Sequence, residues 1–258
     1  MRQLIPSLLV VLLAACRGGH TESPVQAPGA DKSTKTKALE VGAAMLQRAP
    51  PIGALDMYLD GFHFYNGHRD SQMEAHHYCS ALNEEVNQCV IYDGNDKNAK
   101  IMGVEYIISA RLFRALPDDE KPLWHSHAYE VTSGELVAPG LPEVAEHALM
   151  QKLASTYGKT FHTWHTDLDK QLPLGVPQLM MGFTQDGQID PAMVRTRDER
   201  FGVNTAEKRK ERADIKPPPV EPGADAWQEG EVVQFADPTS GAKGHQPSRA
   251  KSQPESEH

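Results

Sequence analysis

Short apolar segments that end in turn dipeptides dominate the middle of the chain. Residues 61–67 are aromatic and finish in Asn66-Gly67, and residues 87–92 run into Asp93-Gly94, a pattern typical of β-strands followed by turns. Residues 101–108 are the expected partner of the second strand, because a turn between two apolar runs favours a hairpin. Three further segments are candidate strands, and the first of them could instead begin a helix: 74–79, 160–166 and 179–184.

Three other segments have the signals of helices. A short helix is expected after Ser109, whose hydroxyl suits an N-cap. The clearest helix is expected over residues 142–157, with Gly158 at its end. Its apolar face is expected to hold Ala145, Leu149, Leu153 and Tyr157. Asp190-Pro191 opens a third helix, and Gly202 closes it.

Strands and helices therefore mix without a regular β-α-β alternation. We predict an α+β fold, a single domain with a mixed or mainly antiparallel sheet flanked by helices. Residues 38–215 are long enough for one such domain with its own core. The segments on either side contain few residues that a core could bury: 16–37 is interpreted as a flexible tether, and 216–258 as a disordered Pro-rich tail.

The N-terminus has the pattern of an export signal. Met1-Arg2-Gln3 precede an apolar run, residues 4–13, which is too short to cross a bilayer as a helix. The sequence Leu13-Ala14-Ala15-Cys16 resembles a bacterial lipobox, in which the cysteine becomes the lipidated first residue of the mature protein. We predict a lipoprotein signal peptide over residues 1–15 and a lipid on Cys16; the alternative is an ordinary signal peptide with an incidental cysteine.

A lipid on Cys16 would make a membrane the first expected partner of the chain. Arg17 stands where retention in the inner membrane usually requires Asp, so the predicted location is the bacterial outer membrane, facing the periplasm. The formal net charge of −9 argues against nucleic acid as a partner, because no basic stripe is available for phosphates. Protein partners are not indicated by any motif.

Histidines provide the candidate chemistry, since nine of the 12 lie between His63 and His165. In a strand, His125-Ser126-His127 would place both imidazoles on one face, where they could share a divalent metal ion such as zinc or iron. Glu130 follows closely, as in the first metal motif of cupin barrels, although a regular strand would turn it to the opposite face. The alternative is that both histidines are hydrogen-bonded supports around neighbouring aromatic residues.

Further candidate ligands come from two other segments. His76 and His77 are adjacent, so a strand would direct them to opposite faces and at most one would enter a shared site. His162 joins the candidates because a bend after it could bring imidazoles together. His147 is excluded, because it faces away from the apolar side of its helix. Cys79 and Cys89 could form a disulfide, remain buried thiols, or bind metal, and a Cys79-His77 pair also raises nucleophilic catalysis.

Several ordered blocks resemble the oil body-associated protein family of plants, which has bacterial and fungal relatives. They include Gly61-Phe62-His63-Phe64-Tyr65, Glu74-Ala75-His76-His77-Tyr78-Cys79, Leu123-Trp124-His125-Ser126-His127 and Tyr157-Gly158-Lys159-Thr160-Phe161-His162. The resemblance covers roughly residues 55–214. It implies association with seed oil bodies and no established catalytic activity. It also implies histidines at 63, 76, 77, 125, 127 and 162 but not at 68 or 165. An obligatory Cys79-Cys89 bridge is not expected, because the plant members work in the cytosol.

Two functions from different classes follow. In the first, the chain is a lipid-anchored envelope lipoprotein with a non-catalytic binding or membrane-surface-associated domain. In the second, it is a metal-dependent enzyme, whose ion is held by ligands drawn from His76, His77, His125, His127, Glu130 and His162.

Overall fold

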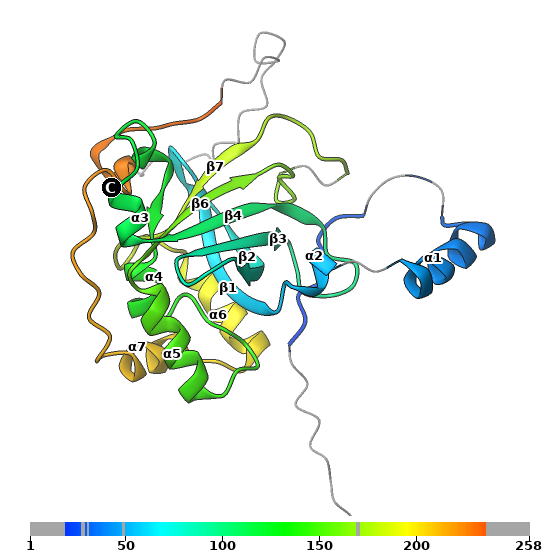
Figure 1. Ribbon diagram of the computed structural model, residues 1–258, viewed down its shortest axis with the longest axis horizontal. Helices are drawn as coiled ribbons and strands as arrows, with labels where there is room; N and C mark the ends of the chain where they lie inside the picture. The colour runs from blue at the N-terminus through cyan, green and yellow to red at the C-terminus, as the bar shows by residue number, and fades with distance from the viewer. Residues whose placement is uncertain (1–18, 27–28, 30, 48–49, 169–170, 236–258) are drawn as a thin grey trace, which may run out of the picture.

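Antiparallel strands form a sheet at the centre of the molecule (Figure 1). The computed structural model describes residues 19–26, 29, 31–47, 50–168 and 171–235, so the signal peptide and Cys16 lie outside the described residues. The strands are β1 (Met57–Tyr65), β2 (His68–Ala81), β3 (Val86–Tyr92), β4 (Ile101–Ser109), β5 (His125–Ser126), β6 (Thr156–His162) and β7 (Gln178–Met181). Their order is β4-β3-β2-β1-β7-β6-β5, and β4 also pairs with β6. The sheet therefore closes on itself through the β4-β6 pair. One face of each strand points into a shared interior.

Helices cover parts of the outside of this sheet. They are α1 (Thr34–Leu46), α2 (Pro50–Gly53), α3 (Ala110–Arg114), α4 (Ala128–Ser133), α5 (Glu143–Leu153), α6 (Pro191–Phe201) and α7 (Thr205–Glu211), with short 3₁₀ turns at Lys121–Leu123 and Ala226–Glu229. In Figure 1, α4, α5, α6 and α7 gather on one side of the sheet, while α1 stands apart from it. The prediction of one α+β domain with a mainly antiparallel sheet is confirmed. The expected N-caps are present too, since Ser109 accepts from the Leu112 amide and Asp190 from the Ala192 amide.

Alternation along the strands decides which side chains enter the interior. His77 of β2 pairs with Leu59 of β1 on one side and with Ile91 of β3 on the other, so all three share a face. Glu105 of β4 pairs with Cys89 of β3 and also with Thr160 of β6. The interior face therefore carries polar residues, His77 and Glu105 among them, beside apolar ones.

Cys79 and Cys89 form a disulfide in the structure, directly across the β2-β3 pair. Both residues are buried and belong to the hydrophobic cluster that includes Leu59 and Ile107. The bridge thus closes the hairpin beside Glu105, although the family resemblance does not require it. Cys79 shares the interior face with His77, two residues earlier.

The helix expected over residues 142–157 is shorter than its apolar pattern predicts. It ends at Leu153, and Tyr157 lies in β6, where it pairs with Ser126 and Ile108. The buried stripe of α5 is formed by Glu146, Met150 and Leu153. A charged residue can occupy that stripe because Arg212 pairs with Glu146 at 3.1 Å, a contact that apolar periodicity cannot reveal.

Both expected flexible segments make defined contacts. In the tether, the Thr21 amide donates to Asn95 Oδ1 at 2.6 Å, and Val25 is buried. In the tail, the Ser126 amide donates to Asp225 Oδ1 at 3.0 Å, and Trp227 packs against Phe64. Ordered structure therefore extends beyond residues 38–215 on both sides, at least over 19–26 and 216–235.

A buried arginine joins α6 to the outer face of β1. Arg197 is fully buried and donates to Asp60 Oδ1 at 3.1 Å and to the Glu135 carbonyl at 2.8 Å. We expect Arg197→Ala to lower the free energy of unfolding by about 3–5 kcal/mol, because Asp60 would keep a buried charge without this partner. Urea unfolding checks the value against Arg195→Ala, an exposed position on the same helix. Equal stabilities of the two variants would contradict this assignment.

Candidate metal centre

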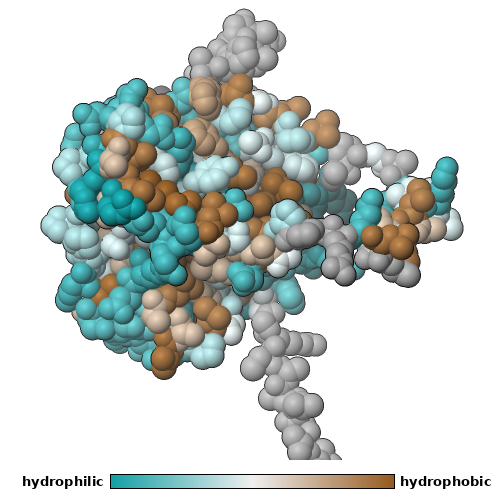
Figure 2. All heavy atoms as spheres, in the orientation of Figure 1, coloured by the Kyte–Doolittle hydropathy of each residue, from teal (hydrophilic) through white to brown (hydrophobic). Residues whose placement is uncertain are grey.

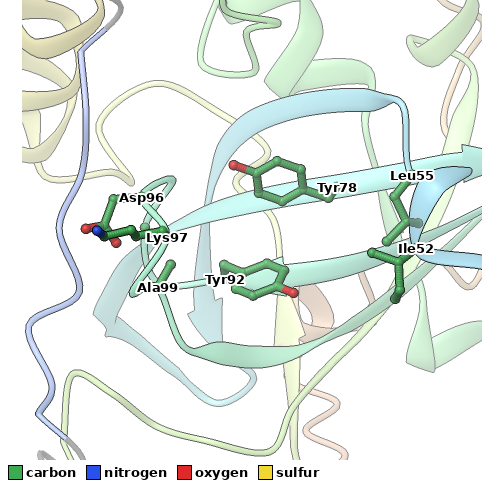
Figure 3. Close-up of a pocket in the computed structure, with 8 residues that line it drawn as sticks. Ile52, Leu55, Tyr78, Tyr92, Asp96, Lys97 and Ala99 are labelled. Atoms are coloured by element: carbon green, nitrogen blue, oxygen red, sulfur yellow. The ribbon is translucent and has the colours of Figure 1, made fainter. Parts of the chain in front are cut away.

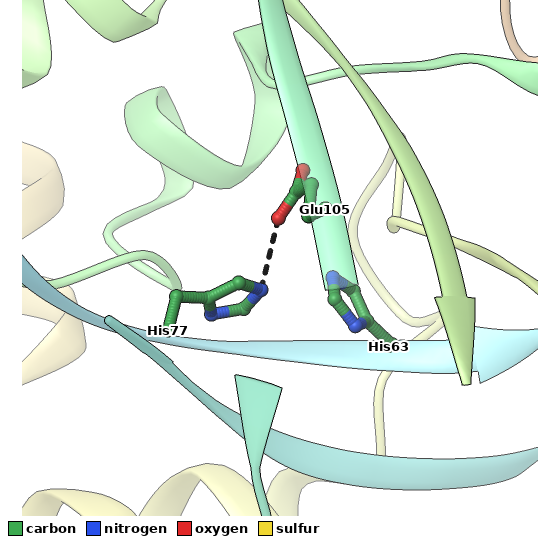
Figure 4. A group of neighbouring side chains, drawn as sticks. All are labelled: His63, His77 and Glu105. Atoms are coloured by element: carbon green, nitrogen blue, oxygen red, sulfur yellow. Dashed lines mark ion pairs between the residues drawn. The ribbon is translucent and has the colours of Figure 1, made fainter. Parts of the chain in front are cut away.

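The interior brings together histidines and carboxylates from five separate segments. His63 of β1 and His77 of β2 lie on either side of Glu105 of β4, as Figure 4 shows. His77 Nε2 is 3.0 Å from Glu105 Oε2. Two groups that could hold a metal ion share Glu105, and in each of them the ligand atoms lie within 4.8 Å of one another: His63, His77 and Glu105, and Glu105, His125 and His127. All five residues are buried.

The second of these groups depends on the turn from β5 into α4. His125 lies in β5 and His127 is the residue before the first turn of α4. His127 Nε2 is 3.0 Å from Glu105 Oε1, and His125 Nε2 is 3.5 Å from the same oxygen. Because the chain becomes helical at Ala128, Glu130 does not point away as a strand would require. Its Oε1 lies 4.0 Å from His125 Nε2.

One hydrogen bond fixes which ring nitrogen of His127 carries the proton. The hydroxyl of Thr156 has a single hydrogen, which it donates to the Leu153 carbonyl at 2.7 Å. His127 Nδ1, 2.8 Å from the same hydroxyl, must therefore be the donor in that contact. A neutral His127 then directs the lone pair of Nε2 at Glu105 Oε1, so two acceptors face each other at 3.0 Å. This arrangement requires a proton or a cation between them.

Burial controls the charges of the cluster. Burial raises the pKa of Glu105, but the contacts with the imidazoles of His127 and His77 outweigh it and hold this pKa well below its ordinary value. Burial lowers the pKa of His125 to about 3, against the opposing charge of Glu105. Burial, and then the charge of Glu105, raise the pKa of Glu130 well above its ordinary value. An ionised carboxylate thus lies beside a neutral imidazole at pH 7, which are the protonation states that metal ligands need.

Two glycines make room for the carboxylates. A Cβ atom on Gly158 would lie 2.0 Å from Glu105 Oε1 and 2.8 Å from His125 Nε2. A Cβ atom on Gly182 would lie 1.7 Å from Glu130 Oε1. Both backbones therefore approach the cluster more closely than any residue with a side chain allows.

A small cavity of about 10 Å³ lies within the cluster, and its lining includes His63, His77, Glu105, His127 and Glu130. This volume corresponds to roughly one water molecule or ion. Both ring nitrogens of His125 and Oε1 of Glu130 are buried and lack a hydrogen-bond partner in the part of the chain that the structure describes. Imidazole nitrogens and carboxylate oxygens are the donors that zinc and related divalent ions prefer. Each of the two groups that share Glu105 therefore offers donors that suit a single ion.

The predicted ligands divide between the two faces of the sheet. His77, His125, His127, Glu130 and His162 all reach the interior, where His162 Nε2 lies 3.4 Å from His63 Nδ1. His76 does not, which corrects its assignment to the same site. It points to the outer face, and its Nδ1 lies 3.0 Å from Asp60 Oδ2, because adjacent residues of a strand have opposite directions.

Other histidines lie elsewhere. His165 is buried with Nε2 3.2 Å from the Val176 carbonyl, and His147 pairs with Asp214 at the surface. Glu105 and His63 are the two central residues that the sequence prediction does not include. Glu105 could have been found in the sequence, because it is the single carboxylate within the apolar run 101–108.

The pH dependence of stability tests whether the buried imidazole of His162 is neutral. Burial, reinforced by His165 and His77, lowers its pKa from 6.5 to about 3. The unfolded chain therefore binds a proton first as the pH falls below 6.5, and stability contributed by this group is lost between about pH 6.5 and 3. We expect the stability advantage of wild type over His162→Gln to fall by up to about 1.4 kcal/mol per pH unit below pH 6.5. Urea unfolding at several pH values measures it, and a constant difference would contradict a neutral His162.

Comparisons with known proteins place the chain in a family. Residues 49–216 match the family described as "Protein of unknown function (DUF1264)". The chain is 44% identical to oil body-associated protein 1B of Arabidopsis thaliana over 198 residues, which cover 77% of this chain and 82% of the relative. It is 41% identical to oil body-associated protein 1A of Zea mays over 226 residues, 84% of this chain and 95% of the relative. No solved structure matches.

These relatives correct part of the sequence prediction. They are oil body-associated proteins of plants, so the prediction of a lipid-anchored envelope lipoprotein at the bacterial outer membrane is wrong. No helix within the described segments is both long enough and apolar enough to cross a membrane. The resemblance to the plant family is confirmed, and the chain belongs to the oil body-associated protein family, with its domain of unknown function DUF1264.

Proposed function

We propose that this chain is a metal-binding protein that holds one divalent ion inside its closed sheet. The proposed ligands are His77, Glu105, His125 and His127. The observation that carries the proposal is the direction of His127, whose Nε2 lone pair faces Glu105 Oε1 at 3.0 Å once Nδ1 has donated to Thr156. A cation between the two atoms converts this repulsion into two coordinate bonds.

A metal ion also accounts for the unpaired polar atoms of the cluster better than a shared proton does. A proton between His127 and Glu105 would satisfy one pair of atoms, whereas both ring nitrogens of His125 lack a hydrogen-bond partner among the described residues. Imidazoles with a carboxylate favour zinc or iron over calcium and magnesium, which prefer oxygen ligands throughout. The hydrogen bond from His127 to Thr156 would orient the ring for coordination, as outer partners of metal-binding histidines commonly do.

The proposed ion has a structural role. Its ligands are at most 4% exposed, and the cavity of about 10 Å³ has no space for an organic substrate beside the ion. The ligands come from β2, β4, β5 and the start of α4, so an ion would tie the short β5-α4 segment to the sheet. We therefore propose metal-dependent folding stability in place of metal-dependent catalysis.

Metal analysis of the purified full-length chain tests this function. We expect about one zinc or iron per chain, lost in His125→Ala/His127→Ala. His147→Ala is the matched control, because that histidine lies at the surface. EDTA should lower the melting temperature of the wild type and leave that of the double variant unchanged. A folded, metal-free wild type after growth in medium that contains both metals would contradict the proposal.

A second function follows from the names of the relatives. We propose that this chain associates with the surface of oil bodies, as its relatives' names say of them. Three large apolar side chains of β4 support this, since Ile101, Val104 and Tyr106 are 52%, 39% and 49% exposed on the outer face of the sheet. Figure 2 shows hydrophobic residues gathered across this side of the molecule. Contiguous exposed apolar surface of this kind marks interaction sites.

Flotation with a phospholipid-coated triacylglycerol emulsion tests the association. We expect the wild type to float with the emulsion and Val104→Glu/Tyr106→Glu to remain in the aqueous fraction, because each charge would have to enter the lipid surface. Val144→Glu, at a residue of α5 that is 84% exposed, should float like the wild type. Equal flotation of the double variant, or no flotation of the wild type, would contradict this function.

A further inference from the structure

A second hollow lies on the opposite face of the sheet from the metal centre. It has a volume of about 360 Å³, and its lining includes Tyr78 of β2 and Tyr92 of β3. Tyr78 follows His77 in the strand, so its ring points outward where the imidazole points inward. The volume falls within the range of about 300–1,000 Å³ that is typical of small-molecule sites.

The hollow has an apolar end and a polar end. Figure 3 shows the two tyrosine rings between them, with Ile52 and Leu55 toward one end and Asp96 and Lys97 toward the other. Ile52 is 66% exposed, so an apolar side chain forms part of the wall while still facing water. An apolar group bound there would remove this surface from water.

Neighbouring aromatic rings hold the tyrosine wall in place. Tyr78 stacks on Tyr58 with a centroid distance of 5.0 Å, and meets Tyr92 edge to face at 5.5 Å. Rings packed in this way lose little side-chain freedom when a ligand binds. The wall is therefore already formed in the free protein.

The charges at the polar end are not equivalent. Both carboxylate oxygens of Asp96 accept hydrogen bonds from Asn98, at 2.8 Å from the backbone amide and 3.3 Å from the side-chain amide. Lys97 is exposed and forms no ion pair with any residue in the described part of the chain. The Asp96 carboxylate keeps its charge but is held by Asn98, whereas the Lys97 ammonium group is free to pair with an anion.

We propose that this hollow binds an amphipathic carboxylate, with its alkyl chain along Ile52, Leu55 and the tyrosine rings and its carboxylate at Lys97. No atom of the proposed metal centre lines the hollow. Carboxylate binding can therefore fail while the metal remains, and the two proposals are tested separately.

Titration calorimetry of the full-length chain with decanoate, decylamine and decanol tests the assignment of the head group. We expect decanoate to bind most tightly, because only its charge complements Lys97. Lys97→Ala should weaken decanoate binding about 3- to 5-fold, the range of an exposed ion pair, and leave decanol binding unchanged. Ile52→Glu should weaken it at least about 10-fold, because the alkyl chain would then have to cover a charged side chain in place of an apolar one. Both substitutions are at exposed positions, and thermal unfolding of each variant checks the fold.

Two variants of α1 provide matched controls. Lys35→Ala removes an exposed lysine, and Leu39→Glu changes a leucine that is 63% exposed, both away from the hollow. Neither should alter decanoate binding. Equal binding of decylamine and decanoate, or no effect of Lys97→Ala and Ile52→Glu, would overturn the proposal. Anionic phospholipid vesicles separate the free acid from a lipid surface, and binding to vesicles without binding to decanoate would also overturn it.

Discussion

Glu105→Gln is expected to release the bound ion and to lower the free energy of unfolding by about 3 kcal/mol or more. Glu105 is 2% exposed, and both of its oxygens lie within 3.0 Å of an imidazole nitrogen, His77 on one side and His127 on the other. Glutamine keeps the shape but loses the charge that would hold the ion, and its amide nitrogen has no lone pair to offer a metal. Breaking a buried charged pair typically costs about 3–5 kcal/mol.

Urea unfolding with and without EDTA separates the two parts of this effect. The wild type should lose stability in EDTA, because an ion that binds the folded state alone stabilises it by mass action. Glu105→Gln should show no response to EDTA. Glu143→Gln, an exposed change on α5, should behave like the wild type. A variant with full stability and full metal content would show that Glu105 does not hold the ion.

Gly158→Ala is expected to have the second-largest effect. The added methyl group would lie 2.0 Å from Glu105 Oε1 and 2.8 Å from His125 Nε2, both of which are buried. Neither side chain can move into solvent, and overpacking of this kind costs about 1–3 kcal/mol, occasionally more. We therefore expect a loss of about 3 kcal/mol, at the upper end of this range, together with loss of the ion.

The matched control is Gly42→Ala in α1, where a Cβ atom would have no neighbour within 4 Å. That substitution should be neutral or should stabilise the helix by up to about 1 kcal/mol. Thermal unfolding and metal content of the three proteins give the comparison. If Gly158→Ala were as stable as the wild type, the close approach of β6 to Glu105 would be wrong.

Local patterns predict several parts of the interior site. Strand alternation alone predicts that His125 and His127 present their imidazoles to one place and that adjacent His76 and His77 separate. The structure has both arrangements. Which of His76 and His77 points inward depends on how β2 pairs with β1 and β3, and pairing over such distances is not encoded in a local pattern.

Glu105 and Glu130 show two different limits of sequence reasoning. Glu105 becomes central because β4 pairs with β3 on one side and with β6 on the other, which places residues 89 and 160 beside it. No local spacing contains that information. Glu130 joins the cluster because a helix begins directly after His127. The boundary between a two-residue strand and a helix cannot be predicted from the local sequence.

X-ray absorption spectroscopy of the purified, metal-containing full-length chain examines the proposed centre directly. We predict about three imidazole nitrogens and one carboxylate oxygen around a single ion, at about 2.0–2.1 Å for zinc. The imidazole scattering should disappear from His125→Ala/His127→Ala. A spectrum dominated by sulfur, by solvent oxygen, or by ligands that survive in this double variant would contradict an ion held between the histidines and Glu105.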